Sequence, residues 1–202
     1  KGSAGAAKSG GDVVWYEDFA NGLAGNTAAG AWSTALANGN IWKWSLTGPV
    51  GAYSDPTAEV ITSTSASNGF MAFWSDSVNS SFATDPPEPL PVFTPYDGAL
   101  VSPVLDLSAT PNLVLVFEHR MRYCCADNPY FVEISTDGGS TWPTRLAATT
   151  AGGNDDPGTV TASFNISAAI AADLTNVRIR FFNDGNGSGT SHYFWQVDDV
   201  QL

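Results

Sequence analysis

Residues 113–123 read LVLVFEHRMRY, and this stretch decides the class of fold. Every second position carries a large apolar side chain, apart from one histidine, while a glutamate and two arginines occupy the alternate positions. Successive side chains of a β-strand point to opposite faces of its sheet. One face of this strand is therefore expected in a core and the other in water, which is typical of an antiparallel sheet.

The rest of the chain has the same texture, with short apolar runs separated by Gly, Pro, Asn and Asp and no sustained helical period. We expect further strands at residues 13–19, 41–46, 69–74, 98–102, 130–135, 159–166, 177–182 and 193–200. Residues 167–173 are expected to form one helical turn, and the proline-rich residues 85–96 a long surface loop. Residues 1–12 are predicted to be a flexible linker. Residues 13–202 then form one all-β antiparallel sandwich domain.

Composition limits the partners. The 202 residues include 8 Lys and Arg against 20 Asp and Glu, a formal net charge of -12. A protein this acidic repels phosphate backbones and anionic lipids. We therefore expect no nucleic-acid partner. The longest apolar run, residues 113–117, is far too short to cross a bilayer, so no membrane insertion is expected. Few lysines, many small polar residues and only two cysteines favour a secreted, extracellular or cell-surface protein.

Residues 135–142, STDGGSTW, match the Asp-box pattern S-x-D-x-G-x-T-W. The glycines permit a tight hairpin, the aspartate ties the turn backbone, and Trp142 is expected to fold back as a plug. Asp boxes occur in sialidases, but there the box is a structural turn remote from the chemistry. We therefore interpret this one as structural.

Residues 193–202, YFWQVDDVQL, place two carboxylates inside an apolar strand. Trp195 and Val197 are expected to point inward, and two positions further on the next inward residue would be Asp199. The apolar residues instead resume at Val200 and Leu202, so the alternation shifts by one residue at Asp198-Asp199, which predicts a β-bulge there. A buried unpaired charge is costly, and a bound cation such as Ca²⁺ would offset that cost. Residues 15–19, WYEDF, likewise set acidic side chains in an apolar strand.

The opening EDFANGL at 17–23, followed by Trp32, and the closing WQVDDV at 195–200 together resemble MAM-like and cleaved-adhesin jelly rolls. These are relatives of the galactose-binding-like sandwiches, found in gingipain-type haemagglutinin regions and other type IX-secreted bacterial surface proteins. Residues 100–108, 131–139 and 177–181 are similar to further segments of that family, in the same order. The resemblance spans residues 15–202 and implies an antiparallel two-sheet jelly-roll β-sandwich with an adhesive role.

In that family a calcium ion joins the first strand to the last. The resemblance implies Ca²⁺ ligands at Glu17, Asp18, Asp198 and Asp199. Relatives often have Glu directly after the Phe of the opening segment, whereas Ala20 stands here, so any ligand from that position is missing or replaced. The alternative is that the four acids simply face solvent.

The two cysteines, Cys124 and Cys125, are adjacent and follow a predicted long strand. In an oxidising compartment neither has another partner within the chain. A disulfide between neighbours is strained, but it would lock a turn. Two reduced buried thiols, or a link to another chain, are the alternatives.

Two further candidate sites lie near the proline-rich loop. Phe82, Phe93 and Tyr96 are candidate ligand-binding residues, because exposed aromatic faces match the apolar faces of sugar rings; the alternative is that they pack in the core. Residues 76–78, DSV, fit the D-[ST]-aliphatic O-glycosylation site of type IX-secreting bacteria, and their polar neighbours suggest an exposed loop. We therefore predict O-glycosylation at Ser77, against a chance match.

Catalytic patterns are scarce, with neither G-x-S-x-G nor H-E-x-x-H present. Glu118 and Glu133, expected on neighbouring strands, would suit a glycosidase pair. Arg120 and Arg122 nearby favour a surface salt-bridge ladder instead, so we expect no enzyme.

The expected function is a calcium-stabilised adhesion or recognition module that binds a glycan or a cell-surface protein. One alternative is a structural subunit that self-associates into an extracellular filament or matrix. The other is an accessory domain of a secreted hydrolase.

Overall fold

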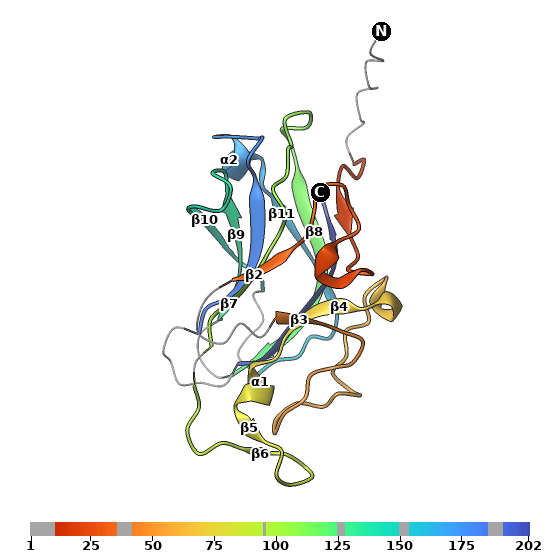
Figure 1. The fold of residues 1–202 in the computed structure, drawn as a ribbon, viewed down its shortest axis with the longest axis vertical. Coiled ribbons are helices and arrows are strands. Elements are labelled where there is room, and N and C mark those ends of the chain that lie inside the picture. Colours follow the sequence, from red (N-terminus) through yellow and green to blue (C-terminus); the bar gives the residue numbers. More distant parts are fainter. Residues whose placement is uncertain (1–10, 36–41, 95, 125–127, 150–153, 186–191) are drawn as a thin grey trace.

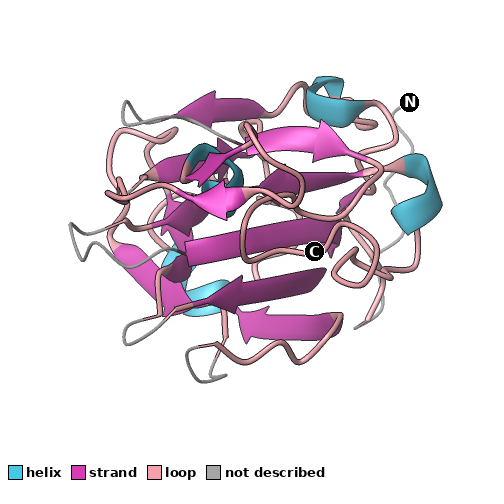
Figure 2. Cartoon of the chain, turned by 90° about the horizontal axis from the view of Figure 1, so that it is seen from below, coloured by secondary structure: helices cyan, strands magenta, loops and turns pink. Residues whose placement is uncertain are grey.

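The computed structural model describes residues 11–35, 42–94, 96–124, 128–149, 154–185 and 192–202. Two antiparallel sheets lie face to face and form a β-sandwich, seen as two layers in Figure 2. The predicted all-β, two-sheet architecture is thus confirmed. None of the helices in the described part of the chain has the length and apolar character needed to span a bilayer.

The six-stranded sheet contains the long strand predicted at residues 113–123. Its strand order is β11 (Val160–Asn165), β8 (Val114–Tyr123), β13 (His192–Gln201), β4 (Phe70–Phe73) and β3 (Trp42–Ser45), and β1 (Tyr16–Glu17) pairs with the end of β13. The first and last strands of the domain are therefore neighbours, as the resemblance implied.

The five-stranded sheet has the order β10 (Thr144–Ala147), β9 (Tyr130–Ser135), β12 (Arg178–Asn183), β7 (Gly98–Val101) and β2 (Ser33–Ala35). Helix α1 (Ser75–Val78) and the paired β5 (Ser80–Ser81) and β6 (Glu88–Pro89) lie at the lower end of the molecule in Figure 1, opposite α2 (Ser167–Ile170). Short 3₁₀ turns occur at η1 (Gly22–Ala24) and η2 (Ala66–Asn68).

The core fills the space between the two sheets. At its centre Phe181 of β12 packs edge-on against Trp195 of β13 and Phe117 of β8, with ring centroids 5.7 and 4.9 Å apart. All three side chains are fully buried. Burying an aromatic side chain stabilises a fold by about 1.5–3 kcal/mol, so this aromatic centre holds the two sheets together.

Most predicted strands are confirmed to within two residues at each end. The first is shorter than the expected 13–19, because Phe19 adopts a left-handed conformation with φ of 53° that ends the strand. Strands β2 and β10 were missed, since each is short and lacks a strong alternation. The helical turn is confirmed as α2, the loop at 85–96 contains β6, and residues 1–10 of the predicted linker lie outside the described residues.

Candidate functional site

Glu17 sits at the end of β1, fully buried, where the chain leaves the six-stranded sheet. Its Oε1 accepts the Phe19 backbone N–H at 2.9 Å, and its Oε2 accepts the Asn26 backbone N–H at 3.1 Å and the Trp32 indole N–H at 3.2 Å. Burial raises its pKa, and these donors oppose that rise. Glu17 therefore holds the loop between β1 and β2 against the core.

Asp18 lies at the surface beside Glu17. Its Oδ1 accepts the Ala20 backbone N–H at 3.0 Å and the Asn26 amide at 2.7 Å, and its Oδ2 accepts the Asn68 amide at 3.1 Å. The Asn68 contact joins the first strand to η2, so Asp18 connects two segments that lie fifty residues apart in the chain.

Asp198 and Asp199 form the predicted bulge, which is confirmed. The register between β13 and β8 shifts between Asp198 and Gln201, and Asp199 has φ of 50°. Asp198 is fully buried and Asp199 nearly so. The left-handed conformation of Asp199 distorts the backbone locally. This distortion causes the one-residue shift in the alternation that the sequence shows.

Serine hydroxyls from the segment before η2 cover the two carboxylates. Asp198 Oδ2 accepts the hydroxyls of Ser63 at 2.6 Å and Ser65 at 3.2 Å. Asp199 accepts the Ser65 hydroxyl at 2.9 Å, the Ser65 backbone N–H at 2.9 Å and the Tyr16 hydroxyl. Sequence reasoning missed these serines, because nothing in the polar segment 63–68 signals contact with a strand more than a hundred residues later.

Two adjacent buried carboxylates, Asp198 and Asp199, are electrostatically unfavourable without a positive counter-charge. Burial, together with the neighbouring Asp199 charge, raises the pKa of Asp198 to about 7. Burial and the hydrogen bond to Asp199 also raise the pKa of Tyr16 well above its ordinary value. Two buried oxygen atoms here, Asp198 Oδ1 and Asn68 Oδ1, have no hydrogen-bond partner.

These orphaned oxygens test the predicted calcium centre. In the described residues no group of three or more His, Cys, Asp or Glu side chains is arranged to hold a metal ion, so the four predicted acids do not form one joint site. Glu17 is already engaged by three N–H donors. Asp198 Oδ1 and Asn68 Oδ1, which have no partner, are a carboxylate and an amide oxygen of the kind that Ca²⁺ prefers, and they fit a cation better than Glu17 does.

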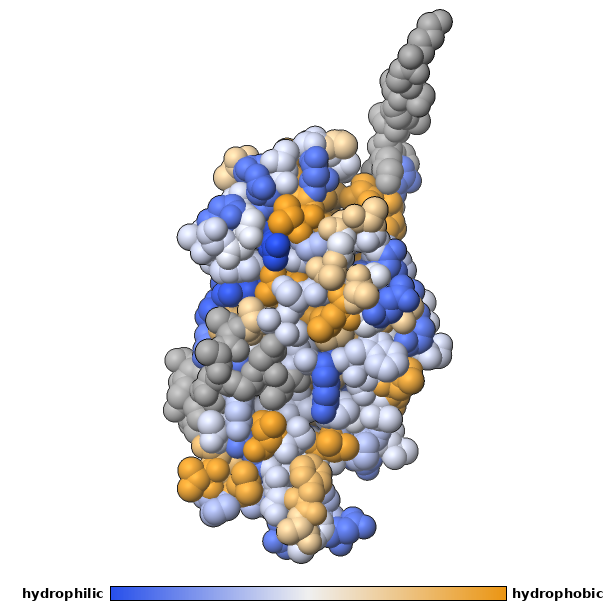
Figure 3. All heavy atoms as spheres, in the orientation of Figure 1, coloured by the Kyte–Doolittle hydropathy of each residue, from blue (hydrophilic) through white to orange (hydrophobic). Residues whose placement is uncertain are grey.

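The aromatic residues near the proline-rich loop differ in exposure. Phe82 is 56% exposed and Val92 is 75% exposed, whereas Phe93 is half-buried and Tyr96 packs partly against the main core. Figure 3 shows hydrophobic atoms at this lower end of the molecule. Of the three predicted ligand-binding residues, Phe82 is thus the one that is well exposed.

The loop is fixed by a buried side chain. Asn79 Oδ1 accepts the Thr94 backbone N–H at 2.9 Å, and its amide donates to the Thr94 carbonyl at 3.1 Å. The Asn79 carbonyl also accepts the Leu90 backbone N–H at 2.9 Å. The returning arm of the loop is therefore tied to the end of α1 at two points.

Ser77 lies in α1 and not in the expected exposed loop, because the segment 75–78 closes one helical turn. It is half-buried, and its hydroxyl donates to the Trp74 carbonyl at 2.8 Å. Neighbouring Asp76 is fully buried and accepts the Tyr53 backbone N–H and the Ser54 hydroxyl. The expected exposed loop was wrong, and O-glycosylation of Ser77 stays a prediction.

The predicted Cys124–Cys125 disulfide falls partly outside the described residues, which do not include Cys125. Cys124 follows the end of β8 and is half-buried against Tyr193 and its neighbours. The disulfide therefore stays a prediction.

The proposed carboxylate pair for glycoside hydrolysis is not assembled. Glu118 lies in β8 of the six-stranded sheet and Glu133 in β9 of the five-stranded sheet, so the expectation of neighbouring strands was wrong. The expectation assumed that strands consecutive in the sequence are neighbours in one sheet, but the connection after β8 crosses to the other sheet. Arg120 pairs instead with Asp156 and Arg122 with Glu59, while Glu118 accepts from Thr64.

The Asp box forms the predicted structural turn. Asp137 Oδ1 accepts the Ser135 hydroxyl at 2.7 Å and the Thr141 backbone N–H at 2.9 Å, and Oδ2 accepts the Thr141 hydroxyl at 2.7 Å. These donors hold its pKa far below the ordinary range. Trp142 folds back as expected, but onto the outer face of the five-stranded sheet and not into the core.

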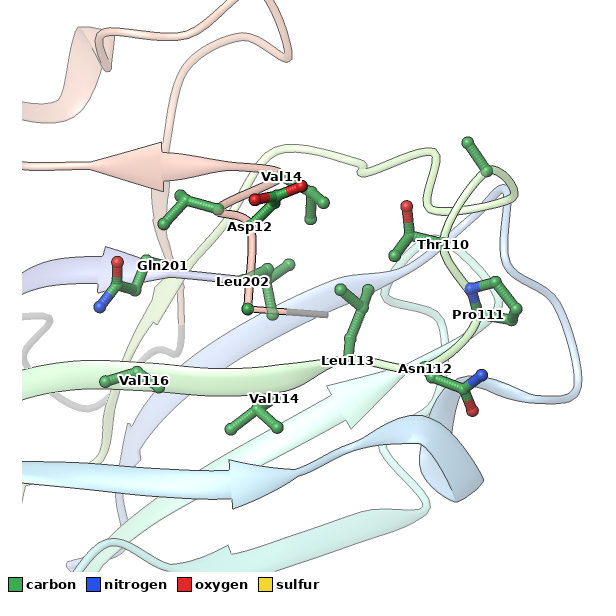
Figure 4. Close-up of a pocket in the computed structure, with 13 residues that line it drawn as sticks. Asp12, Val14, Thr110, Pro111, Asn112, Leu113, Val114, Val116, Gln201 and Leu202 are labelled. Atoms are coloured by element: carbon green, nitrogen blue, oxygen red, sulfur yellow. The ribbon is translucent and has the colours of Figure 1, made fainter. Parts of the chain in front are cut away.

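Two cavities lie away from these residues. One, of about 500 Å³, is walled mainly by apolar side chains such as Val14, Leu113 and Leu202 (Figure 4). The other, of about 420 Å³, opens between β10 and β11 and reaches the buried His119. Burial lowers the pKa of His119 to about 4, and its Nδ1 accepts the Trp195 indole N–H at 3.3 Å. A neutral histidine in this position packs as part of the core.

Comparison with known proteins identifies the fold. The K1 cleaved adhesin domain of Lys-gingipain from Porphyromonas gingivalis is 17% identical with a TM-score of 0.51, over 93% of this chain and 95% of that domain. The K3 cleaved adhesin domain of the same protein is 18% identical with a TM-score of 0.53, over 94% and 98%. No family model and no curated protein sequence matches the chain.

Proposed function

We propose, starting from the fold that this chain shares with cleaved adhesin domains, that it is a non-catalytic adhesion module of a secreted or cell-surface protein. The shared fold over nearly the whole chain carries the proposal. The separation of Glu118 and Glu133 into different sheets supports a binding role over hydrolysis.

The proposed contact surface is the loop that carries β5 and β6. Its exposed apolar side chains are Phe82 and Val92, and Asn79 fixes its returning arm at Thr94. A rigid loop loses little conformational entropy on binding, and buried aromatic anchors dominate most binding interfaces. The partner class is a glycan or a protein of a cell surface.

The test uses the purified chain coated on beads and presented to cells and to immobilised glycans and matrix proteins. The double variant Phe82→Ser with Val92→Ser should lose most of the binding. Leu46, which is 54% exposed at the end of β3, provides the control, because Leu46→Ser removes exposed apolar surface elsewhere. Equal binding by all three proteins would remove the loop from the proposal, and absence of binding to every surface would refute the adhesion function.

We further propose that Ca²⁺ stabilises the bulge of β13. Asp198 and Asp199 would be its carboxylate ligands, with Asn68 supplying an amide oxygen and Asp18 holding Asn68 in place. The ion would supply the counter-charge that the buried carboxylates lack. Glu17 is left out of this set, because all three of its donors are N–H groups fixed by the following loop, whereas two of the three donors to Asp199 are hydroxyls that can rotate away.

A structural subunit of a filament is the second candidate, favoured by one observation. Strand β11, with the sequence VTASFN, is an edge of the six-stranded sheet and carries neither charge nor proline. Edge strands without such protection are templates for pairing with another chain. Sedimentation over a range of concentrations tests this candidate: assembly that Ser163→Lys abolishes would support it, and a monomer throughout would exclude it.

A further inference from the structure

Three arginines gather on the outer face of the five-stranded sheet. Arg145 projects from β10, and Arg178 and Arg180 project from β12, where they alternate with the core residues Ile179 and Phe181. Together with Glu133 and Trp142 they form what we call the arginine face. All five side chains belong to adjacent strands or to the Asp-box turn that follows β9.

Internal ion pairs neutralise two of these arginines. Glu133 Oε1 accepts Arg145 Nε at 2.6 Å, Glu133 Oε2 accepts Arg180 Nε, and Arg145 Nη1 also pairs with Asp184 at 2.8 Å. Glu133 and Asp184 thus pair with Arg145 and Arg180, and Arg178 is left without an ion pair among the described residues. A guanidinium that no carboxylate pairs with can attract an anion locally.

Arg178 is the third arginine of this face. Within the described ranges it is the one arginine without an ion pair. Its Nε is buried and has no hydrogen-bond partner. Asp137 makes no ion pair with it, and its oxygens accept from Ser135 and Thr141. A ligand cannot reach the buried Nε, but the two terminal Nη atoms are neither buried nor hydrogen-bonded within the described residues, so they can donate to an anion.

An aromatic ring lies beside this arginine. Trp142 is half-exposed and stacks on Arg180, whose guanidinium carbon lies 4.3 Å from the ring centroid. A Cβ added to Gly139 would meet Arg178 Cδ at 3.2 Å and Trp142 Cζ2 at 3.5 Å, so the glycine lets the arginine and the indole lie close together. A guanidinium next to an aromatic surface offers a planar fork for a carboxylate and an apolar surface for the group that bears it.

The position of this patch limits the kind of ligand. Peptides commonly bind sheets by adding a strand to an edge, where backbone groups are unpaired. On the arginine face the backbone groups of β9 and β12 are already paired within the sheet, so recognition depends on side chains alone. We propose that the arginine face binds a carboxylate-bearing glycan through Arg178 and Trp142. This inference rests on the proposed adhesion function and names the ligand class of a second contact surface.

The test is direct titration of the purified chain with oligogalacturonate, which carries one carboxylate on each sugar ring. Its methyl ester keeps the rings and removes the charges, and a sulfated oligosaccharide separates carboxylate recognition from general attraction to anions. Binding of oligogalacturonate, with both other ligands about tenfold weaker or more, supports the inference. No binding of oligogalacturonate, or equal binding of its methyl ester, would overturn it.

Protein variants locate the site. Arg178→Gln should weaken binding about tenfold or more, and Arg178→Lys, which keeps the charge but loses the fork, should lie in between. Lys43 is the matched control, since it is also a cation over an indole, 3.7 Å from the Trp74 centroid, on the six-stranded sheet. Equal losses in Lys43→Gln and Arg178→Gln would mean that overall charge, not this face, binds the ligand.

The two proposals fail separately. A chain that adheres to cells but does not bind oligogalacturonate in direct titration refutes the arginine face as a site and leaves the adhesion function standing. A chain that titrates oligogalacturonate but adheres to no cell or matrix refutes the adhesion function alone.

Discussion

The buried carboxylate of Asp198 makes a quantitative prediction for the stability of the protein. In the folded protein its pKa is raised from 3.8 to about 7, first by burial and then by the Asp199 charge. Between these two pH values the folded state keeps a proton that the unfolded state has released. The free energy of unfolding therefore falls as pH rises from about 4 to about 7, and it stays low above that range. At about 1.4 kcal/mol for each pKa unit, the ionised carboxylate costs about 4 kcal/mol.

His119 opposes this trend over nearly the same range. Burial lowers its pKa from 6.5 to about 4, so between these values the unfolded state holds the extra proton and stability rises with pH. The wild-type protein alone should therefore show a shallow pH profile. The informative quantity is the difference between Asp198→Asn and wild type, because His119 contributes equally to both.

The assay is urea denaturation, followed by circular dichroism, from pH 4 to pH 8 in the presence of a chelator. The stability of Asp198→Asn relative to wild type should increase by up to about 4 kcal/mol between pH 4 and pH 7.5. Excess calcium should reduce this difference, because it stabilises only the protein that keeps the carboxylate, by about 2.7 kcal/mol at a hundredfold excess over its dissociation constant. A difference that stays constant with pH would refute the account of the buried charge. A wild type indifferent to calcium would refute the proposed ion.

Three further predictions concern other parts of the molecule. Gly51→Ala should destabilise the fold by about 2–3 kcal/mol in chemical denaturation, since its Cβ would lie 2.3 Å from the buried Asp76 carboxylate; unchanged stability would show that this contact can relax. Tyr96→Ala should lower the melting temperature, because its ring packs on the core, whereas Phe82→Ala should leave the melt unchanged; equal effects would contradict their different burial. Intact-mass measurement of native protein should show sugar additions that Ser77→Ala removes, and a mass equal to the bare polypeptide would exclude O-glycosylation there.

The sequence by itself determined the features that depend on local periodicity. The alternation in residues 113–123 predicted a strand with one buried face, and β8 shows it, with inward residues such as Leu115 and Phe117 fully buried. The change of parity at Asp198-Asp199 predicted the bulge. Both signals lie within a few residues, because side-chain direction in a strand follows from the backbone alone.

Tertiary structure alone decided which distant segments meet. Ser63 and Ser65 donate to Asp198, which lies 135 and 133 residues later in the chain, and no local sequence pattern predicts that contact. Glu118 and Glu133 were expected to be neighbours, yet the chain crosses between sheets after β8 and separates them. The unpaired charge of Arg178 likewise emerges only when β9, β10 and β12 come together and Glu133 takes the other two arginines. Pairing between strands is set by packing of the whole sandwich, so a site built across strands is not encoded in any one of them.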